Sequence, residues 1–313
     1  MKPRIAVVGS VNMDLVFRTP RMPAVGETLS GHEFRQIPGG KGANQAVAAA
    51  RQGADVAFIG RIGDDGFGQY SLRCLADDGI DVSHLSAVAD TATGVAGIIV
   101  TDQGDNSIVL AAGANAALSA EHVEAAQSAI SSAQLLVCQL ETPLPTVTRA
   151  IQLARQHGVK VILNPAPVQA LSDALLAQVD YLVINETEAS QLSGIQVSDR
   201  ESAQRAAEKL LQRGVAVVLL TMGEQGVCIT EQCGNRSESQ FIAAIKVDVV
   251  DTTAAGDTFV GAFAVGIAKG LDIKTASIEA QYTAALTVTK LGAQTSIPRR
   301  SEVEQFMRSR AAL

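Results

Sequence analysis

Short apolar runs alternate with alanine-rich segments along most of the chain. The apolar runs are rich in Val, Ile and Leu, which is typical of strands buried on both faces of a sheet. We expect strands at residues 5–8, 56–59, 135–140, 159–163, 181–184 and 215–220. Helical spacing predicts helices at about residues 42–52, 67–77, 120–131, 144–157, 201–213, 256–269 and 275–289. This alternation predicts an α/β fold with a mostly parallel central sheet and helices on both faces.

Two segments, at about residues 13–38 and 93–113, break the alternation. The second has two β-rich stretches around a polar turn at residues 102–106, which predicts a hairpin. We expect the two segments to form a small antiparallel sheet that covers the main body as a lid and keeps water from a reaction. An extension of the main sheet at its edge is the alternative, and the pattern alone hardly separates the two. In both cases residues 1–313 are expected to form one domain.

Polar residues follow four of the apolar runs. Glu141 follows the run at 135–140, Asn164 the run at 159–163, Asn185 the run at 181–184, and Thr221 the run at 215–220. Any one of them is more often a turn former or a helix cap than a ligand-binding residue. Because ligands bind beyond the carboxyl ends of strands in open α/β sheets, the series indicates one polar cleft.

Composition narrows the range of partners. The net charge is −7 and aromatic residues make up 4% of the chain, so nucleic acid is disfavoured as a partner. A phosphorylated ligand would have to be bound by local amides, a few cations and a metal ion. No apolar run approaches the roughly 18 residues of a membrane span, and the four cysteines form no CxxC pair. We therefore expect a cytoplasmic protein with reduced thiols and no membrane partner.

The segment from Gly39 to Asn44 is rich in glycine and precedes an alanine-rich helix. Its glycines allow the backbone to approach a ligand closely, and Lys41 adds a positive charge. It is not a Walker A loop, because the spacing is missing and Ala43 stands where a hydroxyl would have to hold magnesium. Since Gln45 occupies the place of the third glycine of a dinucleotide-binding fingerprint, a Rossmann dehydrogenase is also disfavoured.

The segment at residues 251–259 leads into an apolar helix. Small residues at the start of a helix leave free amides, and the helix dipole favours an anion there by on the order of 1 kcal/mol. Asp257 lies in the first turn of this helix. It is either a favourable N-terminal carboxylate or a general base beside a phosphate-binding cradle, and on its own the first interpretation is favoured.

Four motifs in order give the chain a resemblance to the ribokinase family of carbohydrate kinases, over essentially its whole length. Residues 9–14 resemble the first sugar-binding segment of the family, and residues 39–45 resemble its glycine-rich signature. Asn185 and Glu188 fit its NxxE motif, and residues 251–257 fit its DTxxAGD signature. The resemblance implies a ribokinase-like fold with a small β-sheet lid. It also implies ATP-dependent phosphorylation of D-ribose at O5, with Asp257 as the general base.

The resemblance also assigns roles to individual residues. The sugar would be bound by Asn12, Met13, Asp14, Gly40, Lys41, Gly42, Ala43, Asn44, Glu141 and Asp257. The amides of Ala254, Ala255 and Gly256 would form an anion hole for the transferred phosphoryl group. The nucleotide would contact Asn185, Thr221, Met222, Gly223, Glu224, Gln225, Gly226, Gly256, Asp257 and Gln281. Mg²⁺ would be held through water or phosphate by Asn185 and Glu188. A K⁺ ion would lie among Asp251, Thr253, Thr287, Lys290, Gly292 and Ser296.

Several alternatives stay open. Ala254 replaces a glycine that many relatives carry, so the entry to the cradle is expected to be stiffer. Met13, between two sugar-binding residues, is expected to bias the choice of sugar, which keeps 2-deoxyribose, a ketohexose or a nucleoside as alternative substrates. A catalytically silent sugar or nucleotide sensor is the alternative that is not an enzyme. Apolar residues on the outside of the lid would favour a homodimer.

Overall fold

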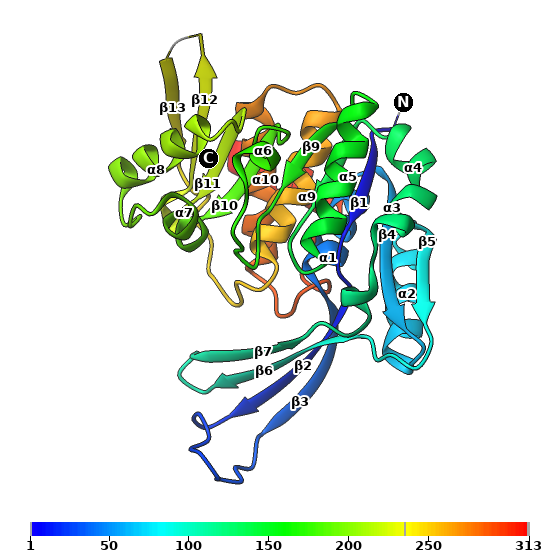
Figure 1. Cartoon of the computed structure of the whole chain (residues 1–313). Coiled ribbons are helices and arrows are strands. Elements are labelled where there is room, and N and C mark those ends of the chain that lie inside the picture. Colours follow the sequence, from blue (N-terminus) through cyan, green and yellow to red (C-terminus); the bar gives the residue numbers. More distant parts are fainter. Residues whose placement is uncertain (1, 235, 312–313) are drawn as a thin grey trace.

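A nine-stranded sheet forms the centre of the molecule in the computed structural model, which describes residues 2–234 and 236–311 (Figure 1). The strand order is β13-β12-β11-β10-β9-β8-β1-β4-β5. Neighbours from β11 to β5 are parallel, and β12 and β13 add an antiparallel edge. The bounds are β1 Arg4–Val8, β4 Asp55–Gly63, β5 Asp81–Val88, β8 Leu135–Cys138, β9 Lys160–Leu163, β10 Tyr181–Asn185, β11 Val217–Thr221, β12 Val227–Cys233 and β13 Arg236–Ile242. The predicted α/β fold is confirmed, whereas β5, β12 and β13 were not predicted.

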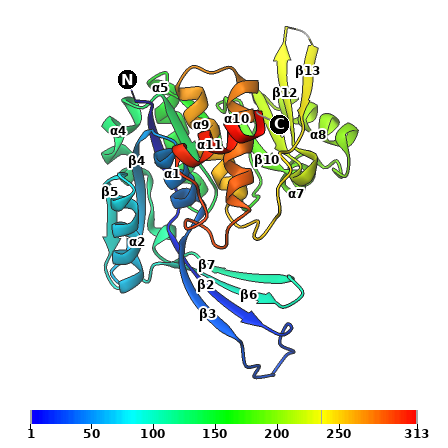
Figure 2. The same ribbon diagram turned by 180° about the vertical axis from the view of Figure 1, so that it is seen from behind.

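Helices cover both faces of this sheet (Figures 1 and 2). One face carries α3 (Ala120–Ala125), α4 (Gln127–Ser131), α5 (Leu144–Gln156), α6 (Asp173–Leu176), α7 (Glu186–Ser193) and α8 (Arg200–Gln212). The other carries α1 (Lys41–Arg51), α2 (Gly66–Asp77), α9 (Ala255–Ala268), α10 (Ile273–Thr287) and α11 (Arg300–Ala311). Ala6 and Val8 of β1 belong to the first core and Ile5 and Val7 to the second, because alternate side chains of a strand point to opposite faces. The helix predicted at 120–131 is divided in two at Ala126.

A second sheet of four strands projects from one end of the body (Figure 1). We call it the lid sheet; its order is β3-β2-β6-β7, with β2 Asn12–Thr19, β3 Glu33–Gly39, β6 Gly94–Thr101 and β7 Asn106–Ala111. The β2–β3 and β6–β7 pairs are antiparallel, and β2 pairs with β6 in parallel. The two segments that break the alternation therefore form a sheet of their own, and an extension of the main sheet is excluded.

The order in which strands are added to the main sheet reverses between β1 and β8. From β1 the chain adds β4 and β5 on one side, and after the lid sheet it returns to add β8, β9, β10 and β11 on the other side. The connections from β1 and β8 thus leave the carboxyl edge in opposite directions, which opens a binding crevice in sheets of this type. Residues 9–12 follow β1 there, and Glu141 follows β8.

The helices α1 and α9 cross at very short range. A Cβ atom on Gly261 of α9 would lie 2.5 Å from the Gln45 carbonyl oxygen, 2.6 Å from Ala48 Cβ and 2.9 Å from Ala49 N. Only a small-residue face on α1 and a glycine on α9 permit such a crossing. The alanine-rich character of α1 is therefore needed for the approach that brings Gln45 beside the start of α9.

Replacing Gly261 by Ala is expected to destabilise the protein by about 1–3 kcal/mol, because the added methyl group forces two packed helices apart. The free energy of unfolding in urea measures the effect. Gly66 of α2 is the matched control, since nothing lies within 4 Å of a Cβ placed there. Equal stability of the Gly261→Ala and Gly66→Ala proteins would contradict the close crossing.

The helices and the cysteines of the described residues bear on the sequence predictions about a membrane span and reduced thiols. No helix in residues 2–234 and 236–311 combines the length and the apolar character required to cross a membrane. The four cysteines are free thiols: Cys138 and Cys228 are buried, Cys74 is half-buried and Cys233 is exposed.

Candidate active site

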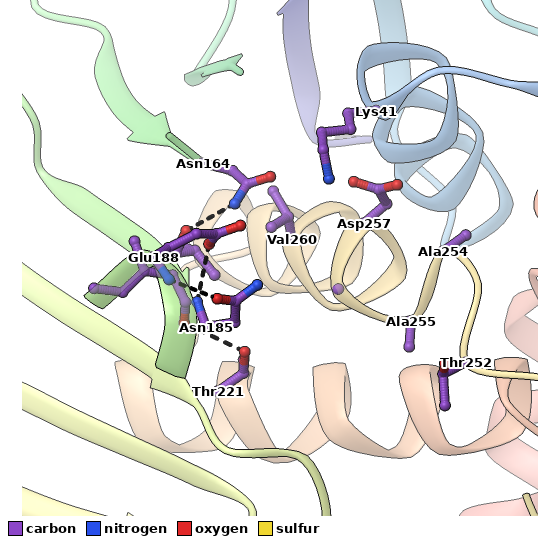
Figure 3. A pocket seen from close by; sticks show the side chains of 13 residues that line it. Lys41, Asn164, Asn185, Glu188, Thr221, Thr252, Ala254, Ala255, Asp257 and Val260 are labelled. Atoms are coloured by element: carbon purple, nitrogen blue, oxygen red, sulfur yellow. Dashed lines mark hydrogen bonds between the residues drawn. The ribbon is translucent and has the colours of Figure 1, made fainter. Parts of the chain in front are cut away.

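A cavity of about 210 Å³ opens where α1 and α9 begin and where β10 and β11 end (Figure 3). Its lining includes eight residues that the sequence indicated: Lys41, Asn185, Glu188, Thr221, Ala254, Ala255, Gly256 and Asp257. Five further residues line it that were not assigned a role: Asn164, Val183, Ile184, Thr252 and Val260. The cavity therefore joins the glycine-rich segment, the NxxE segment and the DTxxAGD segment, which lie far apart in the sequence.

Asp257 lies in the first turn of α9, and its carboxylate accepts hydrogen bonds from two side-chain amides of α1. Its Oδ2 accepts a hydrogen bond from Asn44 Nδ2 (2.9 Å), and its Oδ1 accepts one from Gln45 Nε2 (3.0 Å). The residue is 8% exposed and lines the cavity. Each carboxylate oxygen thus has one fixed donor and keeps capacity to accept a further proton or hydrogen bond.

Lys41 lies beside Asp257 at the start of α1, and its ammonium group points toward the Asp257 carboxylate (Figure 3). Burial alone would lower the pKa of Lys41, but the negative charges of Asp257, Glu141 and, more weakly, Glu188 raise it above its ordinary value. The lysine is therefore a permanent cation in a cavity lined by carboxylates. Its backbone N–H also donates to Glu141 Oε2 (3.0 Å), which joins the start of α1 to the segment after β8.

A second group of polar side chains extends from Lys41 toward the lid sheet. Glu141 Oε2 accepts from the Ser10 hydroxyl and from Asn12 Nδ2 (3.3 Å). Burial raises the pKa of Glu141, although the hydrogen bond from Ser10 and the charge of Lys41 oppose this rise. The crevice between β1 and β8 thus holds acceptors and donors of the kind that vicinal hydroxyls require.

Asp14 completes this group from β2. A Cβ atom on Gly39 would lie 2.4 Å from Asp14 Oδ2, so the glycine leaves the space that the carboxylate fills. Burial, reinforced by the negative charges of Glu141 and Asp257, raises the pKa of Asp14 to about 7. The group therefore changes its charge near neutral pH when no sugar is present.

Replacing Asp14 by Asn is accordingly expected to stabilise the protein in alkaline solution. The ordinary pKa of the group is 3.8, so between about pH 4 and pH 7 the folded protein holds the proton more tightly than the unfolded chain does. Stability of the parent protein falls as the pH rises through this window. The variant lacks that loss, and its gain in the free energy of unfolding is expected to reach about 2–4 kcal/mol at pH 8 and to shrink toward zero near pH 4.

Urea unfolding without sugar at pH 4.5 and pH 8 measures this gain. The exposed Asp64, changed to Asn, serves as the control. A gain that does not depend on pH would contradict a raised pKa for Asp14.

The side-chain oxygen of Asn44 has no hydrogen-bond donor among the described residues. Asn44 Nδ2 donates to Asp257, and within the described part of the chain the buried Asn44 Oδ1 has no hydrogen-bond partner. A buried carbonyl oxygen without a partner is costly unless a ligand supplies the donor. A sugar hydroxyl is a donor of the required kind, in keeping with the sugar-binding role expected for Asn44.

The start of α9 agrees with the expected cradle in one respect and differs from it in another. Ala254 adopts a left-handed backbone conformation (φ 60°, ψ 8°), which costs a residue with a Cβ on the order of 1 kcal/mol. The expectation that alanine stiffens this entry thus has a concrete basis. The N–H of Ala255 donates to the Thr252 carbonyl (3.2 Å), so the first-turn amides left for an anion are those of Gly256 and Asp257.

Asn185 and Glu188 form a capping box at the start of α7. Asn185 Oδ1 accepts from the Glu188 N–H (2.8 Å), and Glu188 Oε2 accepts from the Asn185 N–H (2.9 Å), as drawn in Figure 3. Burial raises the pKa of Glu188, while the bond from Asn185 and the charge of Lys41 oppose the rise. A half-buried carboxylate of this kind favours a nearby cation. Within the described residues, no group of three or more His, Cys, Asp or Glu side chains is arranged to hold a metal ion.

The nucleotide loop predicted at residues 221–226 connects β11 to β12. Thr221 lines the cavity, and its hydroxyl donates to the Ile184 carbonyl (3.3 Å). Met222 is buried, and residues 223–225 form an exposed 3-10 turn. Gln281 lies on α10 outside the cavity lining, and among the described residues its buried Nε2 has no hydrogen-bond partner.

Met13 does not share the face of its neighbours. Because side chains alternate along β2, Asn12 and Asp14 point to one face and Met13 to the other, where it is 1% exposed. A contact between its side chain and a sugar bound by Asn12 and Asp14 is therefore not expected, and the role of Met13 in the choice of sugar stays a prediction.

The residues predicted to surround a monovalent cation lie on two neighbouring segments. Asp251 Oδ1 accepts from the N–H (2.9 Å) and the hydroxyl (2.6 Å) of Thr253, and its Oδ2 accepts from the Gly292 N–H (2.9 Å). Burial would raise the pKa of Asp251, but these hydrogen bonds lower it below its ordinary value. The Ser296 hydroxyl donates to the Ala293 carbonyl (2.8 Å). The side chains of Thr287 and Lys290 are engaged elsewhere, with Thr283 and with Glu302, so only their carbonyl groups could serve a cation here.

Of the side chains that surround Asp257 from behind, sequence analysis indicated Asn164 only as part of a polar cleft and gave Gln45 and Gln139 no role. Gln45, Gln139 and Asn164 form a buried hydrogen-bond network with Asp257. Asn164 had a signal, because it directly follows an apolar run, whereas Gln139 lies inside one. A polar residue inside a predicted strand, such as Gln139, is the one local feature of the sequence that could have indicated a buried hydrogen-bond network.

Comparison with known proteins gives consistent results over nearly the whole chain. Residues 2–300 match the description "pfkB family carbohydrate kinase". The chain is 44% identical over 307 residues to ribokinase of Haemophilus influenzae, covering 98% of this chain and 99% of that protein. It is 39% identical over 303 residues to deoxyribokinase of Salmonella typhi, covering 96% of this chain and 97% of that protein. The solved structure of Arabidopsis thaliana ribokinase complexed with ribose and ATP is 33% identical, with a TM-score of 0.91 and coverage of 98% of this chain and 99% of that chain.

Proposed function

The chain belongs to the pfkB family of carbohydrate kinases, and from this premise we propose that it transfers the γ-phosphoryl group of ATP to O5 of D-ribose. The observation that carries the proposal is a buried carboxylate, Asp257, that lines a cavity next to a half-buried cation, Lys41. A base and a positive charge side by side are what phosphoryl transfer to a hydroxyl requires. The similarity to ribokinases over almost the full length supports ribose as the sugar.

Asp257 accepts the proton of the O5 hydroxyl as O5 forms its bond to the γ-phosphorus. The bond between that phosphorus and the β,γ-bridging oxygen breaks, and ADP leaves with the electron pair. Lys41 and the amides of Gly256 and Asp257 offset the negative charge on the transferred group. Alignment in a closed site can contribute up to about 7–11 kcal/mol, which is more than the base supplies, so closure by the lid sheet matters most.

Mg²⁺ fits the chemistry of the donors at the nucleotide end. Asn185 and Glu188 would hold it through water or phosphate, as hard oxygen ligands do. When bound, the ion neutralises charge on the β- and γ-phosphates. The half-buried carboxylate of Glu188 supports this assignment, because partial burial disfavours its charged form unless a cation lies nearby.

The proposal is tested by measuring ADP release with MgATP and D-ribose, 2-deoxy-D-ribose, D-fructose or adenosine. We expect the highest kcat/KM on ribose, with ribose 5-phosphate as the product identified by mass spectrometry and ³¹P NMR. A site that hydrogen-bonds a hydroxyl discriminates strongly against a sugar without it, because buried polar groups are then left unpaired. Higher kcat/KM on another sugar would change the substrate, and no turnover by the folded protein on any of them would favour a sensor.

Deoxyribose is the second candidate, because a deoxyribokinase is among the relatives. Which side chain faces the 2-position decides between the two sugars. Asn12, Asp14 and Glu141 are the candidates, since they form the polar group nearest the lid sheet.

We propose a K⁺ site between the segments at residues 251–253 and 287–296. Asp251 already links these segments through Thr253 and Gly292, so an ion bound there would stiffen the start of α9. Melting temperature and kcat are both expected to rise when KCl replaces LiCl at equal ionic strength. No change in either quantity would contradict the site.

We also propose that two copies associate through their lid sheets. Phe17, Phe34 and Val109 lie on one face of the lid sheet, and they are 44%, 49% and 73% exposed. Large apolar groups exposed together on a sheet mark an interaction surface. Sedimentation is expected to give a dimer, and Val109→Asp a monomer; a monomeric parent protein would contradict the proposal.

A further inference from the structure

Three buried side-chain amides form a hydrogen-bonded chain behind Asp257. Gln139 Nε2 donates to Gln45 Oε1 (2.6 Å), and Gln45 Nε2 donates both to Asp257 Oδ1 (3.0 Å) and to Asn164 Oδ1 (3.1 Å). Asn164 Nδ2 donates in turn to the Val183 carbonyl (2.9 Å). Gln45 and Gln139 are 0% and 1% exposed, so neither can contact a substrate directly.

The direction of every amide in this chain is determined by its two ends. The Asp257 carboxylate and the Val183 carbonyl can only accept hydrogen bonds. Gln45 must therefore turn its NH₂ group toward Asp257, which leaves its oxygen for the NH₂ group of Gln139. A reversed Gln45 would place its carbonyl oxygen against the carboxylate. The chain thus has one stable arrangement of donors and acceptors.

The backbone is shaped to hold these amides. A Cβ atom on Gly9 would lie 2.3 Å from Gln139 Oε1, and one on Gly42 would lie 2.5 Å from Ser10 N. A Cβ on Gly261 would lie 2.5 Å from the Gln45 carbonyl oxygen. Gly9 therefore makes room for the side chain of Gln139, Gly42 lets α1 approach the segment after β1, and Gly261 lets α1 approach α9.

We propose that Gln45, oriented by Gln139, is a positioning residue that sets the plane of the Asp257 carboxylate for proton abstraction. This inference rests on the proposed role of Asp257 as the base. The terminal torsion of an aspartate is broad, so a carboxylate needs external donors to keep one orientation. Asn44 supplies one donor but also faces the sugar side, whereas both protons of the Gln45 amide are fixed by Asp257 and Asn164.

The test is a double-mutant cycle with Gln45→Met and Gln139→Met, which remove the amides and keep the approximate length of the side chains. Misplacing a reacting group by about 1 Å can cost about 10²-fold, so Gln45→Met is expected to lower kcat by about 10- to 100-fold. Gln139→Met acts only through Gln45, and we expect about a 3- to 10-fold loss. In the Gln45→Met protein the second change is expected to alter kcat by less than about two-fold. KM for ATP stays within about two-fold throughout, because no nucleotide contact changes.

Gln52→Met is the matched control. Gln52 is a buried glutamine near the end of α1 whose Nε2 donates to the Pro298 carbonyl (2.9 Å), away from Asp257. Its replacement is expected to lower the melting temperature about as much as Gln45→Met does, with kcat within about two-fold of the parent protein.

Each outcome separates this inference from the function on which it rests. Additive losses in the double variant, or a Gln45→Met protein with full kcat, would overturn the positioning role while leaving Asp257→Asn inactive. Activity retained by Asp257→Asn itself would overturn the role of the base, and with it this inference.

Discussion

Replacing Asp257 by Asn is expected to lower kcat for ribose phosphorylation by about 10²–10⁴-fold, the usual contribution of a positioned base. Asparagine keeps the size of the side chain but cannot accept the O5 proton. Its NH₂ group would also face the amide donors of Asn44 or Gln45, which now point at a carboxylate oxygen each. Steady-state assays with saturating ribose and MgATP measure the loss.

Folding is expected to survive this change. Asp257 raises the pKa of Asp14 and of Glu141 through its negative charge, so removing that charge relieves repulsion in the cavity. We therefore expect the protein to stay folded while activity is lost, because the relief of repulsion offsets the mismatched amide contacts. The control is Asp272→Asn, which changes another aspartate at a helix N-terminus, where the carboxylate accepts from Thr275 N (2.9 Å). If both variants kept full activity, Asp257 would be no more than a helix-terminal carboxylate.

Replacing Lys41 by Met is expected to lower kcat by about 10²–10³-fold, because a preorganised charge facing the transferred group is lost. The same change leaves the carboxylates of Asp257, Glu141 and Glu188 without the cation that now lies among them. The pKa values of Glu141 and Glu188, already raised by burial, should then rise further. A carboxylate with a raised pKa in the folded state destabilises the protein as the pH increases.

The variant is accordingly expected to lose more stability than the parent protein between pH 5 and pH 8. Urea unfolding at the two pH values measures this difference, and kcat is measured in parallel. Lys269→Met is the control for the loss of a lysine, because Lys269 lies at the C-terminal end of α9, far along the helix from Asp257. A Lys41→Met protein with kcat within about five-fold of the parent would show that this ammonium group does not stabilise the transferred phosphoryl group.

Local signals in the sequence were sufficient for much of the fold. The strands from β8 to β11 are continuous apolar runs, the helices α1, α5 and α8 have apolar residues at helical spacing, and α9 is apolar on nearly all sides. Each of these elements lies within a few residues of its predicted place. The strands β12 and β13 at the antiparallel end of the sheet were missed because β12 ends in polar residues and β13 is polar and partly exposed, so their apolar pattern is weak. The short helices α6 and α7 were missed because four to eight residues give too little periodicity to detect.

The chemistry of the site divides in the same way. Asp257, Lys41 and the glycines around them belong to contiguous motifs, so the order of residues along the chain was enough to single them out. Hydrogen bonds between residues far apart in the sequence could not be predicted from contiguous motifs. Ser10 and Glu141 are 131 residues apart in the sequence, and Gln45 and Asp257 are 212 apart, and no local pattern encodes either hydrogen bond.

The sequence by itself thus determined the class of fold and singled out the lid segments and the motifs that contain Asp257 and Lys41, because these depend on periodicity and on contiguous residues. Only the tertiary structure decided that Met13 faces away from Asn12 and Asp14 and that Ala254 is left-handed. It alone also decided that Gln139 and Gln45 support Asp257 from behind. These features depend on how distant segments approach one another, and that approach is determined by the packing of α1 against α9 and by the order of the strands.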